Sequence, residues 1–170
     1  MTTSDKHPGW MVAPTRVQHS EAAALLRDYY VDVADRYRLL HLGRRSTPAE
    51  IDRELTADSA DDLIPPRGLL LLGRYDGEPA ACAGFRVLGN AVVELTRVFV
   101  RQQWRGTGGG RHLLIAVETA ASALGATQVV LDTRLDLVEA RALYRRHGYA
   151  EIPAYSNGDY AEIWYGKSLS

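Results

Sequence analysis

Cysteine is almost absent from this sequence, which has a single one, Cys82, among 170 residues. A lone cysteine cannot form an intrachain disulfide, so burial of apolar side chains must stabilise the fold, and a reducing cytoplasm is the expected location. Cys82 lies in the apolar run 80–83 with no cation directly beside it. This setting favours a buried, inert side chain over a nucleophile.

Long apolar runs and an excess of one charge are also lacking. No apolar stretch approaches the roughly 20 residues of a transmembrane helix, and residues 1–9 have neither the basic start nor the apolar centre of a signal peptide. The formal net charge of -1 gives no electrostatic reason to bind nucleic acid or an anionic membrane. We therefore expect neither of these partners.

A metal site is not expected either, because none of the five histidines has a cysteine, histidine or aspartate partner at ligand spacing. The length fits one domain of ordinary size, large enough to be stable without a metal or a disulfide. No repeat, low-complexity tract or linker divides the chain. We predict a flexible tail at residues 1–10 and a single domain over residues 11–170.

Hydrophobic periodicity predicts an alternation of helices and strands. Helical spacing of apolar residues begins after Ser20, the expected N-cap, and indicates one long helix or two short ones. Thr47, followed by Pro48 and then Glu50, has the pattern of a capped second helix. The expected elements are a strand at 12–17 interrupted by Pro14, helices at 20–40 and 48–57, a loop at 58–62, strands at 69–75, 79–87 and 92–100, a helix at 108–124, a strand at 129–131, a helix at 138–147, and a closing strand pair at 149–152 and 161–167.

Three of these strands stand close together and are joined by short turns. The pairs Asp76-Gly77 and Gly89-Asn90 favour tight turns, so residues 69–100 are predicted to form an antiparallel meander. Helices and strands alternate after the meander. Together these patterns indicate an α/β (α+β) fold with a mixed, twisted central sheet flanked by helices.

Four glycines within residues 106–110 join the last meander strand to the next helix. Glycine at this density lets backbone N–H groups crowd around an anion, and the helix N-terminus adds unpaired donors and the positive end of its dipole. Arg105 and Arg111 flank the loop and add positive charge. The loop therefore predicts a phosphate or diphosphate site, with a flexible turn as the alternative for such a run taken alone.

Two common phosphate-binding loops do not fit this segment. A Walker A loop ends in Gly-Lys-Ser or Gly-Lys-Thr, whereas Gly110 is followed by Arg111 and His112. A dinucleotide-binding fingerprint opens the first strand–helix–strand unit of its fold, but here a three-strand meander comes first. Asp132 is near the distance required of the acidic partner, yet the preceding topology is wrong for that loop.

The loop instead resembles the coenzyme A loop of the GNAT superfamily of N-acetyltransferases. The family pattern is Gln or Arg, two residues, Gly, one residue, then Gly or Ala, and the similarity in order and spacing extends from Glu94 to the C-terminus. The N-terminal third is similar only in the order of its elements. The positions that carry the resemblance are Gln103, Trp104, Arg105, Gly106, Thr107 and Gly108 in the loop, Glu94 to Val100 in the strand before it, Leu113 and Leu114 in the helix after it, and Ala140, Leu143, Tyr144, Gly148 and Tyr149 further along.

This resemblance implies the GNAT acyl-CoA N-acyltransferase fold and an enzyme that moves an acetyl group from its co-substrate acetyl-CoA to a primary amine of a small molecule or peptide. The alternative is a coenzyme A binding sensor or regulatory module without turnover. The family also implies that the pantetheine arm enters where the fourth and fifth strands separate, and it leaves a homodimer open. The implied donor-binding residues are Val98, Phe99 and Val100 for pantetheine, and Arg105, Gly106, Thr107, Gly108, Gly109, Gly110 and Arg111 for the diphosphate.

Acetyl transfer to an amine requires a proton to leave the amine and benefits from a proton given to the departing thiolate. Tyr144 stands where the family has its general-acid tyrosine, and with a reference pKa of about 10 it is protonated at neutral pH. Its alternative role is packing on an apolar helix face. Glu94, an acidic residue in an apolar strand, is the candidate base, acting through water. For Glu94 the alternative is a solvated side chain or an ion pair with Arg97.

One position departs from the family pattern. Many members have an asparagine seven residues before the tyrosine, where this chain has Leu137. We expect that contact with the donor to be lost, or to be replaced by Asp136 or Arg141. The backbone amide of Phe99 is the expected donor to the oxyanion. Aromatic residues that could wall the acceptor pocket, with core packing as their alternative role, are Tyr29, Tyr30, Tyr37, Tyr155, Tyr160, Trp164 and Tyr165.

Overall fold

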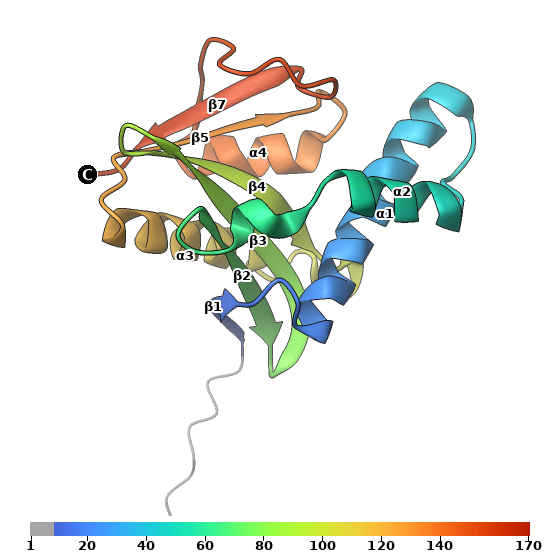
Figure 1. Ribbon diagram of the computed structural model, residues 1–170, viewed down its shortest axis with the longest axis horizontal. Coiled ribbons are helices and arrows are strands. Elements are labelled where there is room, and N and C mark those ends of the chain that lie inside the picture. The colour runs from blue at the N-terminus through green and yellow to red at the C-terminus, as the bar shows by residue number, and fades with distance from the viewer. Residues whose placement is uncertain (1–8) are drawn as a thin grey trace, which may run out of the picture.

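The computed structural model describes residues 9–170, so residues 1–8 of the predicted tail lie outside the described part of the chain. The central sheet has seven strands in the spatial order β1-β2-β3-β4-β5-β7-β6 (Figure 1). The strands are β1 (Trp10–Thr15), β2 (Gly68–Tyr75), β3 (Glu78–Gly89), β4 (Val92–Val100), β5 (Gln128–Thr133), β6 (Ala150–Glu151) and β7 (Ile163–Ser168). The helices are α1 (Ser20–Leu42), α2 (Pro48–Ala57), α3 (Gly109–Ala123) and α4 (Val138–Arg146).

The sheet confirms the predicted class because it is mixed and flanked by helices. β2, β3 and β4 form the expected antiparallel meander, whereas β4 and β5 pair in parallel and β7 runs antiparallel to β5. Asp76 and Gly77 both take positive φ in the β2–β3 turn. β1 pairs with β2 at the edge of the sheet, where the missing N–H of Pro14 does not break an interior ladder.

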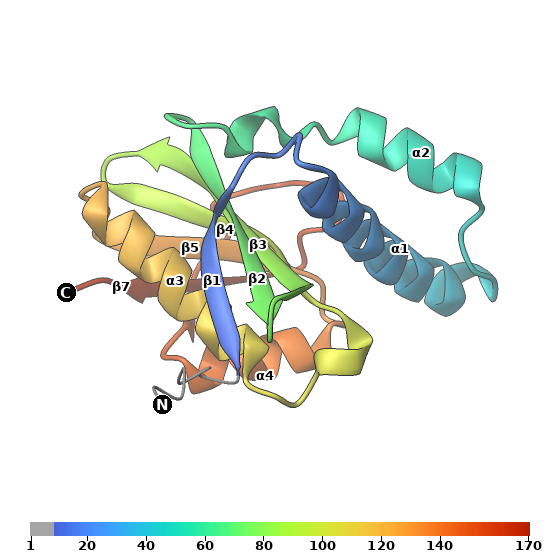
Figure 2. The same ribbon diagram turned by 90° about the horizontal axis from the view of Figure 1, so that it is seen from below.

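Helices cover both faces of the sheet (Figure 2). On one face, Leu113, Leu114 and Val117 of α3 are fully buried in the larger apolar cluster, which Tyr144 of α4 joins. On the other face, α1 packs in a second cluster that contains Cys82. Burial raises the pKa of the Cys82 thiol to about 12, which agrees with the inert role expected for it.

Three details of the predicted elements were wrong. The segment after Ser20 is one long helix, which was one of the two alternatives, but its N-cap is His19 and not Ser20, and His19 Nδ1 accepts from the Glu21 amide at 3.3 Å. The acidic stretch expected as a loop runs into a 3-10 turn at Ala60–Leu63. The closing strand pair is present but short, since β6 has two residues and β7 begins at Ile163. Residues between β6 and β7 instead contact β4 and β5.

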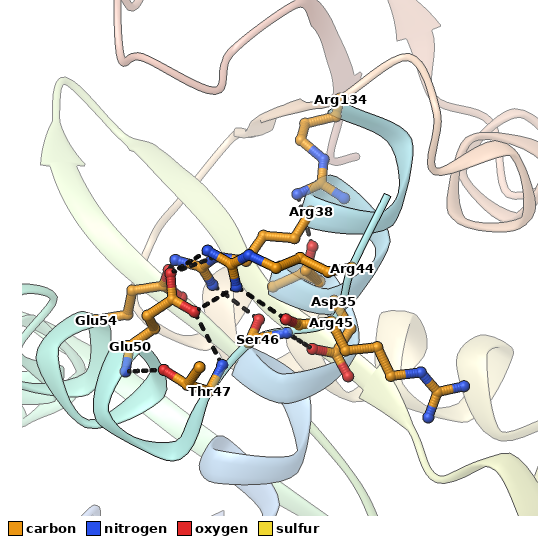
Figure 3. A network of polar contacts seen from close by, with 10 residues as sticks. Asp35, Arg38, Arg44, Arg45, Ser46, Thr47, Glu50, Glu54 and Arg134 are labelled. Carbon is orange, nitrogen blue, oxygen red and sulfur yellow. Dashed lines mark hydrogen bonds and ion pairs between the residues drawn. The ribbon is translucent and has the colours of Figure 1, made fainter. Parts of the chain in front are cut away.

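The corner between α1 and α2 is fixed by polar contacts (Figure 3). Thr47 and Glu50 form the predicted capping box, because Thr47 Oγ1 accepts from the Glu50 amide at 3.2 Å and Glu50 Oε1 accepts from the Thr47 amide at 2.9 Å. Arg38 of α1 pairs with Glu50 at 3.1 Å and with Glu54 at 2.9 Å. These contacts hold α2 against α1 on their shared side of the sheet.

Candidate active site

β4 and β5 separate after three residue pairs. Their parallel pairing covers Val92–Glu94 against Gln128–Val130. Beyond these residues β4 remains paired with β3, and β5 with β7, so the facing backbone edges of β4 and β5 have no ladder partner among the described residues. A bulge follows, in which Arg97, at a φ of 54°, and Val98 both stand opposite Ala83. Because a bulge bends its strand, it contributes to the separation.

A cavity of about 620 Å³ opens at this separation. Its walls come from β4, β5, α1, α4 and the loop before α3, which brings together segments far apart in the sequence. Among the expected catalytic and donor-binding residues, Thr107 is the one that does not line the cavity. Those that do are Glu94, Val98, Phe99, Val100, Arg105, Gly106, Gly108, Gly109, Gly110, Arg111 and Tyr144.

The glycines of the loop serve two different purposes. Gly106 and Gly108 have φ values of 79° and 91°, which side-chain-bearing residues rarely adopt. Gly110 instead permits close packing, because a Cβ at that position would lie 2.7 Å from Cδ2 of Leu143 on α4. The loop can therefore make its turn, and α4 can approach the start of α3.

The backbone amides of residues 106–111 are free to bind an anion. Within residues 9–170, none of these six N–H groups donates to a backbone or side-chain acceptor, and the first such bond of the helix is that of His112 to Gly108 O at 3.1 Å. Gly108 is the N-cap of α3, so the positive end of the helix dipole lies at the same place. This arrangement of donors suits a phosphate or diphosphate.

Cationic side chains surround the loop. Arg105 Nε donates to Val100 O at 3.0 Å, and its Nη2 lies 3.6 Å from Asp32 on α1. Arg111 and Arg146 also line the cavity, and Arg146 was not anticipated because nothing in its helical repeat distinguishes it from Arg145. Burial lowers the pKa of His147, and the positive charges of Arg111, Lys167 and Arg146 lower it further. The field at this end of the cavity therefore favours an anion.

Tyr144 lies on α4 and lines the cavity where β4 and β5 separate. Its side chain is 6% exposed and packs against Tyr149 and Tyr165, with ring centroids 5.9 and 6.1 Å away. In the described part of the chain its hydroxyl has no hydrogen-bond partner, and burial raises its pKa above the ordinary value for tyrosine. Tyr144 thus lines the cavity with a hydroxyl that burial keeps protonated. Its ring also packs against other aromatic rings, which was the alternative role considered for it.

Glu94 is buried on β4 and is neither solvated nor paired with Arg97. It is 6% exposed, its Oε1 accepts from Arg86 Nε at 3.0 Å, and its Oε2 accepts from the Tyr155 hydroxyl at 2.7 Å. Arg97 pairs instead with Asp58, at 3.1 Å. The alternative environment considered for Glu94 was therefore wrong, and its carboxylate is held by a cation and a phenol at the edge of the cavity.

A second carboxylate, Asp132, lines the cavity from β5. It accepts from Ser156 Oγ at 2.9 Å, and no arginine or lysine side chain pairs with it in the part of the chain that the structure describes. Burial raises the pKa of Asp132, and the nearby charge of Glu94 raises it further. In the sequence, Asp132 was considered only as the acidic partner of a dinucleotide-binding loop, and that type of loop was rejected. Its place near Glu94 could not be predicted, because it depends on how the strands pair.

Leu137 is the N-cap residue of α4 and lines the cavity. The two residues proposed to replace the family asparagine, Asp136 and Arg141, do not line it. Asp136 makes a bidentate pair with Arg134 at 2.9 and 3.0 Å, and Arg141 donates to Leu135 O at 2.9 Å. Neither residue therefore replaces the asparagine, because both side chains are held by local contacts, and loss of that contact with the donor stays the prediction.

The predicted aromatic wall is also largely absent. Of its expected members, Tyr29 lines the cavity. Tyr155 contacts Glu94 from outside it, and Tyr37 packs edge-on against Tyr160 at 5.2 Å. Tyr165 is in the core. The aromatic residues therefore pack or hold other side chains more than they form a pocket.

No group of three or more histidine, cysteine, aspartate or glutamate side chains in residues 9–170 is placed to hold a metal ion. In the same range, no helix has both the length and the apolar character needed to cross a membrane.

Comparison with known proteins identifies relatives. An uncharacterised N-acetyltransferase of Schizosaccharomyces pombe is 27% identical over 126 residues, which cover 68% of this chain and 77% of the relative. Among solved structures, one assigned as an acyl-CoA N-acyltransferase of Klebsiella pneumoniae has a TM-score of 0.72 at 22% identity, covering 95% of this chain and 98% of its own. A GNAT acetyltransferase of Elizabethkingia anophelis with acetyl-CoA bound has a TM-score of 0.61 at 19% identity, covering 95% and 99%.

The structural neighbours establish the fold, and a family model extends the match to the sequence. The model described as "Acetyltransferase (GNAT) family" matches residues 27–149, which is more than half of the chain. The match includes the separated strands, the glycine loop and Tyr144. The chain therefore belongs to the GNAT family of acetyltransferases.

Proposed function

We propose that this protein transfers an acetyl group from acetyl-CoA to a primary amine of a small molecule or peptide. The observation that carries the proposal is the row of free amides at residues 106–111, beside the cavity where β4 and β5 separate. A diphosphate matches those donors in charge and in hydrogen-bonding character. The neighbour from Elizabethkingia anophelis, whose structure contains acetyl-CoA, supports this choice of donor.

The pantetheine arm would bind along the open edge of β4. Residues Val98 to Val100 have no β5 partner, so backbone groups on that edge can bond an extended amide chain as a further strand would. The amides of the arm supply both donors and acceptors for such bonds. This orientation directs the thioester from the glycine loop toward the middle of the sheet.

The reaction forms a bond between the amine nitrogen and the acetyl carbon and breaks the bond from that carbon to sulfur. An amide on the open edge of β4 would donate to the carbonyl oxygen as it gains negative charge. The Phe99 amide expected for this role faces β3 instead, because Phe99 pairs with Cys82 in the register in which the Arg101 amide donates to Ala80 O. Tyr144 would give its proton to the departing thiolate, which it can do because burial keeps its hydroxyl protonated. The amine proton would pass through water to Glu94, which Tyr155 and Arg86 hold at the edge of the cavity.

Asp132 would bind the incoming amine. It is the cavity carboxylate without a cationic side chain as a partner among the described residues, whereas Arg86 pairs with Glu94. An ammonium group could therefore bind Asp132 without displacing an arginine. On this basis we expect acceptors that are cationic at neutral pH before they lose a proton.

The proposal is tested by following free thiol release from acetyl-CoA with a panel of polyamines, amino acids, amino sugars and short peptides. We expect thiol release that depends on one class of amine. Binding of acetyl-CoA without release for any amine would favour a sensor or regulatory module instead.

The donor site is tested separately with Gly108→Glu, which places a negative side chain among the free amides. Calorimetry should show loss of coenzyme A binding in this variant. Gly43→Glu is the matched control, since Gly43 also takes a positive φ, of 70°, and no atom lies within 4 Å of a Cβ at that position. Unaltered affinity in the Gly108 variant would place the diphosphate elsewhere.

A further inference from the structure

The side chain of Trp10, on the edge strand β1, contacts the glycine loop at Thr107, 97 positions further along the sequence. Its indole Nε1 donates to Thr107 O at 3.2 Å and to Thr107 Oγ1 at 3.0 Å. Its ring lies directly against Gly109, where an added Cβ would be 2.5 Å from Cζ2. The loop therefore packs on the tryptophan ring and bonds its N–H.

These contacts determine which way one peptide group faces. The carbonyl of Thr107 and the N–H of Gly108 belong to the same planar trans peptide, so they point in opposite directions. Because the carbonyl is turned toward Trp10, the Gly108 N–H is turned away from it. Gly108 lines the cavity, and its N–H is among the free donors of the loop.

Thr107 is held from its other side as well. Its hydroxyl donates to Trp104 O at 2.6 Å while accepting from Trp10. The hydroxyl therefore both donates and accepts a hydrogen bond within the protein, and the carbonyl oxygen accepts one. This explains why the Thr107 side chain does not line the cavity although it lies within the loop: its hydroxyl bonds other parts of the protein.

Trp10 itself is fixed by its neighbours. Its ring packs edge-on against Tyr75, with centroids 5.5 Å apart, and a Cβ on Gly73 would lie 3.3 Å from it. The residue before it is tied to the β2–β3 turn, because the Gly9 amide donates to Asp76 Oδ1 at 2.7 Å. The indole is thus a rigid support.

We propose that Trp10 is a positioning residue of the donor site, which holds the Thr107–Gly108 peptide so that the loop amides face the diphosphate. The inference rests on the proposed function, since it assumes that the loop binds coenzyme A. A glycine-rich loop has many conformations to lose on binding, and a loop already held in the binding conformation loses fewer. Trp10 would therefore strengthen donor binding without touching the donor.

The test is calorimetric titration with coenzyme A of Trp10→Phe, Thr107→Val and the double variant. We expect each single variant to bind about tenfold more weakly, because each removes hydrogen bonds that hold the loop in its binding conformation. The double variant should lose less affinity than the sum of the two single losses, since the bond from Trp10 Nε1 to Thr107 Oγ1 is lost in both. Thr107→Ser keeps the hydroxyl and should recover most of the affinity lost in Thr107→Val. Met11→Ala, a neighbouring exposed position on β1, is the control and should bind as the wild type does.

The outcomes separate this inference from the proposed function. If the wild type binds no coenzyme A, the proposed function fails. If the wild type binds and both Trp10→Phe and Thr107→Val bind equally well, the positioning role is wrong while the proposed function stands. Additive losses in the double variant would also overturn it, since they would show that the two side chains act independently. If Trp10→Phe does not fold, Thr107→Val still removes the bond from Trp10 Nε1 to Thr107 Oγ1, and unaltered affinity in that variant would contradict the positioning role.

Discussion

Three side chains around the separation of β4 and β5 have different surroundings. Tyr144 and Glu94 approach it from opposite faces of the sheet, since Val93 and Leu95 pack in the same cluster as Tyr144 and side chains alternate along a strand. Burial keeps the Tyr144 hydroxyl protonated, Arg86 balances the charge of Glu94, and Asp132 has no such partner among the described residues. These differences are the basis for the roles proposed for them as proton donor, proton acceptor and ammonium site.

The role of Tyr144 is tested by Tyr144→Phe. The phenyl ring can keep its packing against Tyr149 and Tyr165, so acetyl-CoA affinity should hardly change. Turnover should fall by at least about tenfold, because general-acid assistance to the thiolate is lost. Steady-state kinetics and calorimetry measure the two quantities, and Tyr160→Phe, at an exposed tyrosine, is the control. Equal turnover would leave Tyr144 with a packing role alone.

Asp132→Asn tests the ammonium site. The change removes the charge and keeps the size, so KM for the amine should rise by about tenfold with a smaller effect on kcat. Burial raises the pKa of Asp132, so in the wild type amine binding should weaken as pH falls through that raised pKa, and at a higher pH than an ordinary aspartate would give. The variant should lack this acidic limb. An unchanged KM and pH profile would exclude Asp132 from acceptor binding.

At the scale of elements, local patterns in the sequence were sufficient for most of the fold. Turn pairs specified the meander, and the limits of β4 agree with the prediction at both ends. The bulge at Arg97 could not be foreseen, because an arginine with positive φ has no distinctive local pattern and depends on the pairing of β4 with β3. The length of β6 was overestimated, because the residues that follow it stop pairing as a strand and make side-chain contacts with β4 and β5 instead.

The start of α2 allows a test at this scale. Thr47→Ala removes the side chain that accepts from the Glu50 amide, and the free energy of unfolding should fall by about 1 kcal/mol. Thr47→Ser retains the oxygen and should lose much less. Denaturant unfolding measures both, and equal losses in the two variants would show that the cap contributes little.

At the scale of the molecule, the site depends on contacts that join distant parts of the chain. Tyr155 and Glu94 are 61 positions apart, and Trp10 and Thr107 are 97 apart. The glycine loop and the tyrosine could be predicted because each is a local pattern with a chemical reason. Asp132, Trp10 and Arg146 could not, because their relation to the site arises only when the sheet forms.

Burial of ionisable side chains on the α1 side of the sheet predicts how the whole fold responds to alkali. Burial raises the pKa of Tyr29 from 10.0 and that of Cys82 from 9.0, each to about 12. Since the folded state holds both protons more tightly, the stability they contribute is complete below about pH 9 and is lost as pH rises toward about 12. Chemical denaturation over this range should show the decline, and Cys82→Ala should make it shallower. A free energy of unfolding independent of pH would contradict this.

The central claim is that the free amides of residues 106–111 bind the diphosphate of the donor. The most direct measurement is a titration of isotopically labelled protein with coenzyme A, followed through its backbone N–H resonances by NMR. The resonances of Gly108, Gly109 and Gly110 should move downfield and saturate together as their amides become hydrogen-bonded. Saturable binding that leaves these three resonances in place while others move would contradict the account.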